Sequence, residues 1–136
     1  HLKSDPPTPD QTKAAVADID EQLSILDLPK GVPLIGTAGT ATTMAAVDLR
    51  LQQFSRASVH GHRMDSGQID RQVATFLELT VADRKRLPGL EAPRADVIAG
   101  GALIFSRIIA AMKAPGFLVA DCGVRWGLAY ELLDAA

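Results

Sequence analysis

The chain has 136 residues and 47% of them are hydrophobic, so it is long enough to bury a core as one domain or part of one. It has 14 basic and 16 acidic residues, and the basic residues are scattered, which argues against a DNA-binding face. The single cysteine, Cys122, excludes an internal disulfide and indicates a reducing compartment. No signal peptide is visible, so we expect a cytoplasmic protein. The loop-like residues 1–7 predict a fragment of a longer protein.

A helix is expected directly after this first segment. Thr8 can cap it, Pro9 suits the first helical position, and Gln11 completes a capping box. Apolar residues at helical spacing then mark one buried face, formed by Val16, Ile19, Leu23 and Leu26. The helix should therefore run to about residue 26, before a turn at residues 29–31.

A strand, a turn rich in glycine and threonine, and a helix follow one another between residues 32 and 51. Leu34 and Ile35 predict a short buried strand, and the helix is expected over residues 41–51. Two glycines in the turn at residues 36–40 permit a positive φ and the close approach of a partner. Free N–H groups and the positive end of the helix dipole make this succession typical of a phosphate site. A plain connection with a threonine cap is the alternative.

The next region contains two histidines and two helix starts. Residues 58–64 are a candidate strand in which His60 and His62 would share a face. That spacing can ligate a metal, but no acidic or cysteine residue joins the pair at metal-site spacing, so we favour structural or cleft-edge histidines. Asp65 and Gln68 predict a capping box. The buried face of that helix should comprise Ile69, Val73, Phe76 and Leu77, and a short helix should begin at Thr80, followed by a solvated charged segment at residues 83–86.

Residues 94–112 form the most apolar expected helix, which should be buried on most of its surface. Asp96 and Arg107 interrupt it, so it is a poor membrane span, and it could serve a core or a homodimer contact. Gly100 and Gly101 lower its helix propensity, and the close approach of another backbone would compensate for that cost.

Arg94 is a candidate anion ligand. It lies in the first turn of the expected helix, where its charge opposes the helix dipole, so a bound anion would compensate for it. The alternative is an exposed ion pair with Glu91 or Asp96.

A second strand, glycine turn and helix end the chain. The strand is expected at residues 116–120, and the last helix should run to about residue 133. Two such turns at the carboxyl ends of neighbouring strands would form a crevice in which ligands bind. Asp121 either caps the last helix or faces phosphate through metal or water, beside Gly123. Cys122 has no adjacent His and Asn arrangement, which favours a buried thiol over a nucleophile.

Five segments in order resemble the exopolyphosphatase and guanosine-pentaphosphate phosphohydrolase family. They are SDPPTP at residues 4–9, GTAGTATT at 36–43, VHG at 59–61, RADVIAGGAL at 94–103 and DCGVRWG at 121–127. The resemblance covers nearly the whole chain. It implies an α/β fold of the actin-like type, shared with ribonuclease H-like proteins, sugar kinases and heat-shock chaperones, in which two domains flank a cleft. Residues 1–136 would then be a single domain, the C-terminal part of the second one.

The resemblance also implies an activity. Family members hydrolyse the terminal phosphoanhydride of polyphosphate or of guanosine pentaphosphate, an alarmone of the bacterial stringent response, with a divalent metal that is usually Mg²⁺. The turn at residues 36–40 corresponds to their phosphate- or nucleotide-facing loop. The phosphate-binding hairpin, the first domain, its catalytic glutamate and most metal-holding residues have no counterpart in this chain. The chain should therefore contribute half of a cleft and be inactive alone.

These expectations assign no catalytic or metal-holding residue within the chain. Phosphate or nucleotide contacts are expected from Gly36, Thr37, Ala38, Gly39, Thr40, Arg94, Asp121 and Gly123. The expected partners are polyphosphate, guanosine pentaphosphate or tetraphosphate, and the first domain, with neither DNA nor a membrane. Two alternatives stay open: a non-catalytic module that binds polyphosphate or the alarmone and regulates a partner, and a relative of the sugar kinases or chaperones.

Overall fold

The structure is a computed structural model that describes residues 1–134. Its strands are separated by helices along the chain, which confirms the α/β class. In chain order they are α1 (Pro9–Ser24), β1 (Leu34–Thr37), α2 (Ala38–Asp48), α3 (Arg56–Val59), β2 (Arg63–Asp65), α4 (Ser66–Glu78), α5 (Val81–Arg84), the 3-10 helix η1 (Ala92–Arg94), α6 (Ile98–Met112), β3 (Gly116–Ala120) and α7 (Val124–Asp134).

The strands form one sheet in the order β1-β3-β2. β1 and β3 are parallel neighbours, with Leu34 opposite Phe117 and Thr37 opposite Ala120. β2 pairs with the other edge of β3 in the antiparallel sense. Because β1 and β3 run in the same direction, the turns that follow them lie at the same end of the sheet.

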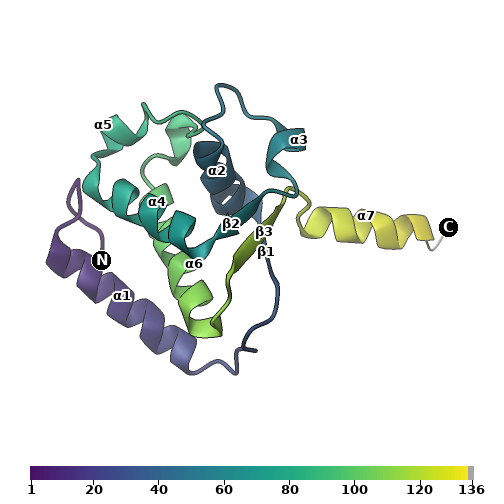
Figure 1. The fold of residues 1–136 in the computed structure, drawn as a ribbon, viewed down its shortest axis with the longest axis horizontal. Coiled ribbons are helices and arrows are strands. Elements are labelled where there is room, and N and C mark those ends of the chain that lie inside the picture. Colours follow the sequence, from purple (N-terminus) through teal and green to yellow (C-terminus); the bar gives the residue numbers. More distant parts are fainter. Residues whose placement is uncertain (135–136) are drawn as a thin grey trace.

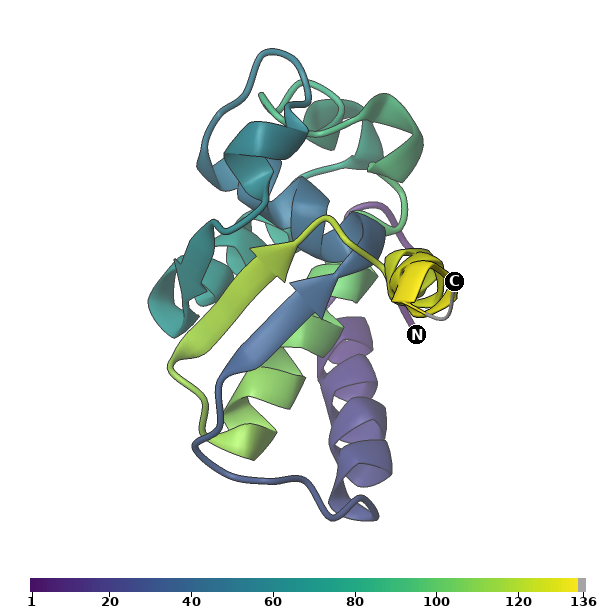
Figure 2. The same cartoon turned by 90° about the vertical axis from the view of Figure 1, so that its right-hand side faces the viewer.

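Helices cover one face of this sheet. α2 packs on β1 and β3, and α6 packs against α4, α2 and α1. The views in Figures 1 and 2 agree on this layer: α6 and α1 lie behind the strands, while the sheet face turned to the viewer in Figure 2 carries no helix of the described chain. The largest fully buried side chains include Phe76, Met44, Met64, Ile69 and Ile98.

The opposite face of the sheet is apolar and open. A hollow of about 430 Å³ lies over it, lined by residues that include Leu34, Ile35 and Leu118. The Ile35 side chain on β1 is 65% exposed. α7 projects from the body beyond the end of β3 (Figure 1) and has no buried residue.

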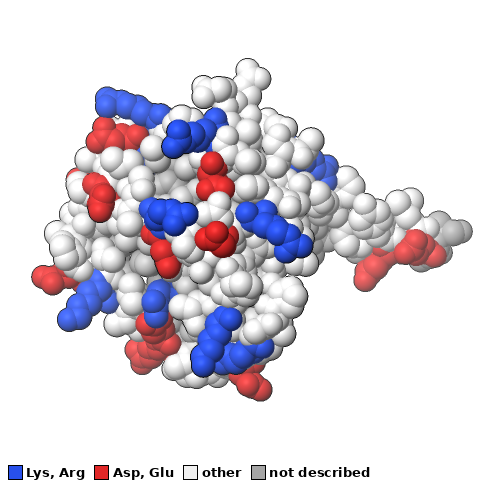
Figure 3. All heavy atoms as spheres, in the orientation of Figure 1, with Lys and Arg blue, Asp and Glu red and all other residues white. Residues whose placement is uncertain are grey.

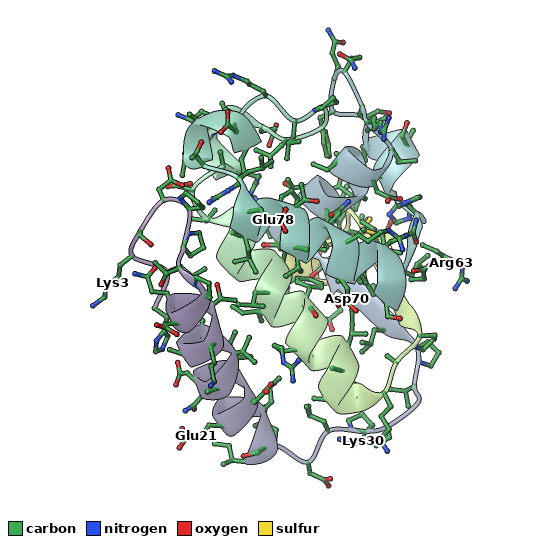
Figure 4. All side chains as sticks on the ribbon, turned by 60° about the vertical axis from the view of Figure 1, so that its left-hand side comes forward. Lys3, Glu21, Lys30, Arg63, Asp70 and Glu78 are labelled. Carbon is green, nitrogen blue, oxygen red and sulfur yellow. The ribbon has the colours of Figure 1, made fainter. Side chains whose placement is uncertain are left out.

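The predicted helix starts with capping boxes are confirmed. The Thr8 hydroxyl accepts a hydrogen bond from the Gln11 N–H at 3.3 Å, and Asp65 Oδ1 accepts one from the Gln68 N–H at 2.7 Å. α1 is fixed to α6 by Arg107, whose Nε and Nη2 donate to the two carboxylate oxygens of Asp20 at 2.7 and 2.8 Å. Figure 4 shows α1 lying alongside α6.

Several predicted elements differ from the structure. α1 ends at Ser24, and Leu26, which was expected on its buried face, is 54% exposed. The apolar helix begins at Ile98 rather than at Arg94, because residues 92–94 form η1 and Pro93 interrupts the pattern there. Residues 58–64 are not one strand, since α3 ends at Val59 and β2 begins at Arg63. Gly101 is approached by a side chain rather than by a backbone: a Cβ on it would lie 2.7 Å from Thr40 Oγ1 of α2.

The predicted solvated segment at residues 83–86 is wrong for Arg84, which is only 3% exposed. Its Nη1 donates to the Ala95 carbonyl at 2.6 Å and its Nε to the Leu79 carbonyl at 3.1 Å. Asp5 lies 3.5 Å from Nη2. The guanidinium therefore joins three separate segments, and these partners compensate for its removal from water.

Charged side chains are otherwise distributed over the surface. On the face seen in Figure 3, acidic and basic residues are interspersed and form no continuous basic stripe. Lys3, Glu21, Lys30 and Arg63 point outward around the edge of the view in Figure 4. No described helix combines the length and the apolar character that a membrane crossing requires.

Candidate functional site

The turn after β1 begins α2 without a side-chain cap. Thr37 occupies the N-cap position in extended geometry, but its hydroxyl makes no capping hydrogen bond. α2 starts at Ala38, three residues earlier than predicted, and Ala38 adopts a left-handed φ of 64°. A non-glycine residue in this conformation costs of order 1 kcal/mol and is typical of functional turns. The first N–H groups of α2 are thus left without the threonine cap that the alternative interpretation required.

The two glycines of the turn serve close packing, and neither adopts the positive φ that a glycine permits. A Cβ on Gly36, which is buried in β1, would lie 2.6 Å from the Phe117 ring. A Cβ on Gly39 would overlap the guanidinium of Arg94. Gly36 therefore permits packing within the core, whereas Gly39 permits an arginine to lie flat on the start of α2.

Arg94 forms the ion pair that the sequence offered as the alternative to anion binding, and its outer nitrogens face the start of α2. Its Nε donates to Glu91 Oε2 at 3.2 Å, which confirms the predicted ion pair. The outer nitrogens Nη1 and Nη2 lie against Gly39. The predicted opposition to a helix dipole is wrong for α6, since Arg94 belongs to η1. The guanidinium instead lies at the positive end of α2, so an anion bound there would be favoured by both.

The threonines of the turn contribute unequally. Thr37 is exposed, and its hydroxyl has no hydrogen-bond partner among residues 1–134. The Thr40 side chain lies close to Gly101. The Thr42 hydroxyl donates back to the Ala38 and Gly39 carbonyls at 3.3 Å, so it is not free for a ligand.

The two turns meet in a pocket of about 510 Å³. Ala38 from the first turn and Asp121 and Gly123 from the second line it together with Arg56, Val124, Arg125 and Trp126. The Asp121 N–H donates to His60 Nδ1 at 3.2 Å, which fixes the second turn to the end of α3. The crevice expected from two parallel strands with adjacent turns is therefore present. Of the predicted site residues it brings together Ala38, Asp121 and Gly123, whereas the lining does not include Gly36, Thr37, Gly39, Thr40 or Arg94.

Val124, Arg125 and Trp126 line this pocket without having been predicted as site residues, and so does Arg56, which lies outside the five family-like segments. Its Nε lies 3.3 Å from Asp121 Oδ2, and its Cζ lies 4.5 Å from the centre of the Trp126 ring. Its Nη2 donates to Cys122 Sγ at 3.1 Å, so the thiol is half-buried and has a polar partner. Arg56 lies in a short polar segment with no periodicity, and no local pattern indicates that it turns toward residues 121–126.

The two histidines differ in role: His60 accepts from Asp121 at the edge of the pocket, whereas His62 makes a structural contact away from it. His62 Nε2 lies 2.8 Å from Asp48 Oδ2, and Gln68 donates to the same oxygen at 3.1 Å. Among residues 1–134, no three His, Cys, Asp or Glu side chains gather as a metal ion would require. Asp121 is the one carboxylate lining the pocket, and it is paired with Arg56. The described residues therefore do not fit a resident Mg²⁺ on their own.

Comparison with known proteins gives consistent results. The model of the Ppx/GppA phosphatase family matches residues 1–136. Exopolyphosphatase 2 of Mycobacterium tuberculosis is 29% identical over 113 residues, which are 79% of this chain and 35% of that protein. A crystal structure of the Aquifex aeolicus member of the Ppx/GppA family has a TM-score of 0.89 at 30% identity and covers 98% of this chain and 44% of its own.

An exopolyphosphatase from Cytophaga hutchinsonii has a TM-score of 0.81 at 18% identity, which supports the fold alone. The expected actin-like fold is confirmed by these superpositions. The chain thus spans about a third of the length of the curated relative, 35%, and less than half of the Aquifex structure, 44%.

Proposed function

The chain belongs to the Ppx/GppA phosphatase family, and from this premise we propose that it forms one wall of the cleft of a phosphoanhydride hydrolase. The substrate would be polyphosphate, guanosine pentaphosphate or both, and the reaction would release the terminal phosphate. One observation carries the proposal: the Arg94 guanidinium lies against Gly39, at the uncapped start of α2.

The chemistry of that arrangement suits phosphate. The free N–H groups and the positive dipole end of α2 attract an anion, and the guanidinium adds a fixed cation with two outer nitrogens. Without an anion these two positive groups oppose each other, since Glu91 neutralises Arg94 only from the Nε side. A phosphate group would satisfy both at once through paired hydrogen bonds.

Hydrolysis also needs a base, a positioned water and more positive charge than this wall supplies. We propose that these groups, and the residues that hold Mg²⁺, come from polypeptide of the parent outside residues 1–136. The open apolar face of the sheet and the exposed apolar side chains of α7, such as Val124 at 92% and Leu132 at 66%, support such a packing partner. The chain alone would then be inactive.

The test is to titrate guanosine tetraphosphate and tripolyphosphate into the full-length parent, as wild type, Arg94→Ala and Arg94→Lys, at two salt concentrations. Removal of the guanidinium should cost about 1.5–3 kcal/mol of binding free energy, the range for a hydrogen bond to a charged group. Lysine should restore only part, because it lacks the planar fork. Arg86→Ala is the matched control, since Arg86 also pairs with an exposed carboxylate, Asp83, at 3.0 Å.

Equal affinities for wild type and both Arg94 variants would assign Arg94 to an ordinary surface pair. An activity assay separates the enzyme from the regulatory module. With Mg²⁺, the parent should release phosphate from polyphosphate or guanosine pentaphosphate, and the 136-residue chain should not. Tight binding without turnover by the parent would favour the non-catalytic module, and substantial turnover by the chain alone would contradict the proposed division of the cleft.

A further inference from the structure

Arg56 is held in place by residues far from it in the sequence. It opens the short helix α3, and its guanidinium meets the turn after β3 and the first turn of α7. The Trp126 ring covers it at 4.5 Å, Asp121 pairs with Nε at 3.3 Å, and Cys122 Sγ accepts from Nη2 at 3.1 Å. Three different interactions thus fix one side chain at the rim of the pocket.

One edge of this guanidinium is unused. Nη1 has no hydrogen-bond partner within residues 1–134, and the side chain is 48% exposed. Arg56 lines the same pocket as Ala38, the residue that begins α2. An arginine that is already stacked on an aromatic ring loses little conformational freedom when it binds a ligand. The free edge is therefore prepared for an anion rather than needed for the fold.

We propose that Arg56 is a second phosphate-binding side chain of this cleft and that Asp121 is its neutralising partner when the cleft is empty. This inference rests on the proposed function, because it assigns a further residue to the same site. The ligand chemistry is a chain of linked phosphates, inorganic or attached to a nucleoside. Such a ligand has several negative groups, so it can engage Arg56 in addition to the start of α2.

The proposed role of Asp121 predicts that variants of Arg56 and Asp121 change phosphate affinity in opposite directions. Its carboxylate neutralises Arg56 and also repels an entering phosphate. Removal of the arginine should weaken phosphate binding, whereas removal of the acidic charge should strengthen it. A merely structural ion pair would lose stability in both cases and would not give opposite changes in affinity.

The experiment uses the full-length parent in EDTA, so that no metal bridges Asp121 and phosphate, with tripolyphosphate and guanosine tetraphosphate as separate calorimetric probes. Arg56→Ala should weaken binding about tenfold. Asp121→Asn should tighten it about two- to fivefold, the range for release of an exposed ion pair. Arg56→Lys should lie between wild type and Arg56→Ala, and Arg86→Ala should match wild type.

The outcomes separate this inference from the proposed function. If wild type binds neither probe, the proposed function fails. If wild type binds and Arg94→Ala weakens binding while Arg56→Ala does not, only the role of Arg56 is overturned. Weaker binding by Asp121→Asn would also overturn it, and this variant remains informative if Arg56→Ala fails to fold. If Arg56→Ala loses affinity for only one of the two probes, the role of Arg56 is supported, and that probe shows whether the bound phosphate chain is inorganic or attached to a nucleoside.

Discussion

Replacement of Gly39 by alanine tests the central contact of the candidate site. The added Cβ would overlap Nη1 and Cζ of Arg94 and lie 2.6 Å from Nη2. Non-bonded heavy atoms pack best at about 3.5–4.0 Å, so the guanidinium has to move by about 1 Å or more. Its side chain is 41% exposed and pairs only with the exposed Glu91 in the described chain, so this movement costs little folding free energy.

Two small and opposing effects determine how Gly39→Ala changes the free energy of unfolding. Alanine reduces the conformational freedom of the unfolded chain, which stabilises the protein by about 0.4–1 kcal/mol at a compatible position. Displacement of an exposed arginine offsets part of this gain. The free energy of unfolding should therefore change by less than about 1 kcal/mol. Binding should suffer more, because a displaced Arg94 loses the contact with phosphate that we propose for it, which would be worth about 1.5–3 kcal/mol, or about 10- to 150-fold in Kd.

The assay combines denaturant unfolding with titration of guanosine tetraphosphate or tripolyphosphate in the full-length parent. Gly36→Ala is the contrasting variant, because its Cβ would meet the Phe117 ring in the core and should cost about 1–3 kcal/mol of stability. Gly127→Ala, which meets nothing within 4 Å, is the neutral control. In the Arg94→Ala background, Gly39→Ala should add almost nothing to the loss of affinity. Additive losses, or a large loss of stability with full affinity, would refute the reasoning.

Two further substitutions test the fold that supports the site. Arg84→Met should lower the free energy of unfolding by about 2–4 kcal/mol, since it leaves the buried Ala95 carbonyl and the half-buried Leu79 carbonyl without a donor. Arg86→Met should be nearly neutral in the same denaturation experiment. Ala38→Gly should raise the thermal midpoint, because glycine adopts the φ of 64° without steric cost. The free energy of unfolding should increase by about 0.5–1 kcal/mol. An unchanged or lower midpoint would show that Ala38 is not strained.

Local signals predicted much of the fold. The capping boxes at Thr8 and Asp65 are determined by neighbouring residues, so α1 and α4 begin where the sequence indicates. The strands 34–37 and 116–120 also follow from short apolar runs beside glycine. The repeated pattern of strand, glycine turn and helix also predicted that the two turns meet in one crevice. The resemblance to a family supplied what these patterns cannot, namely the actin-like fold and the phosphate chemistry expected of the crevice.

The errors have a common physical origin in contacts between distant segments. Arg84 is buried because carbonyls from residues 79 and 95 surround it, and its immediate neighbours resemble a solvated surface. The left-handed conformation falls on Ala38 rather than on a glycine, because Gly36 and Gly39 are needed for close packing. Arg56 is defined by residues 121–126, which lie more than sixty positions further along the chain. Sequence spacing carries no information on such partners.

The projection of α7 has a consequence for hydrogen exchange. This helix of 11 residues has no buried residue, and an isolated helix of that length is marginal in water. In the 136-residue chain its amides should exchange by local fraying, while those of β3 around the fully buried Val119 exchange only when the whole domain opens. The part of α7 beyond Trp126, whose ring is held by Arg56, can therefore order and disorder without any change in the core. A ligand bound to Arg56 would strengthen that anchor, slow exchange in α7 and leave β3 unaltered.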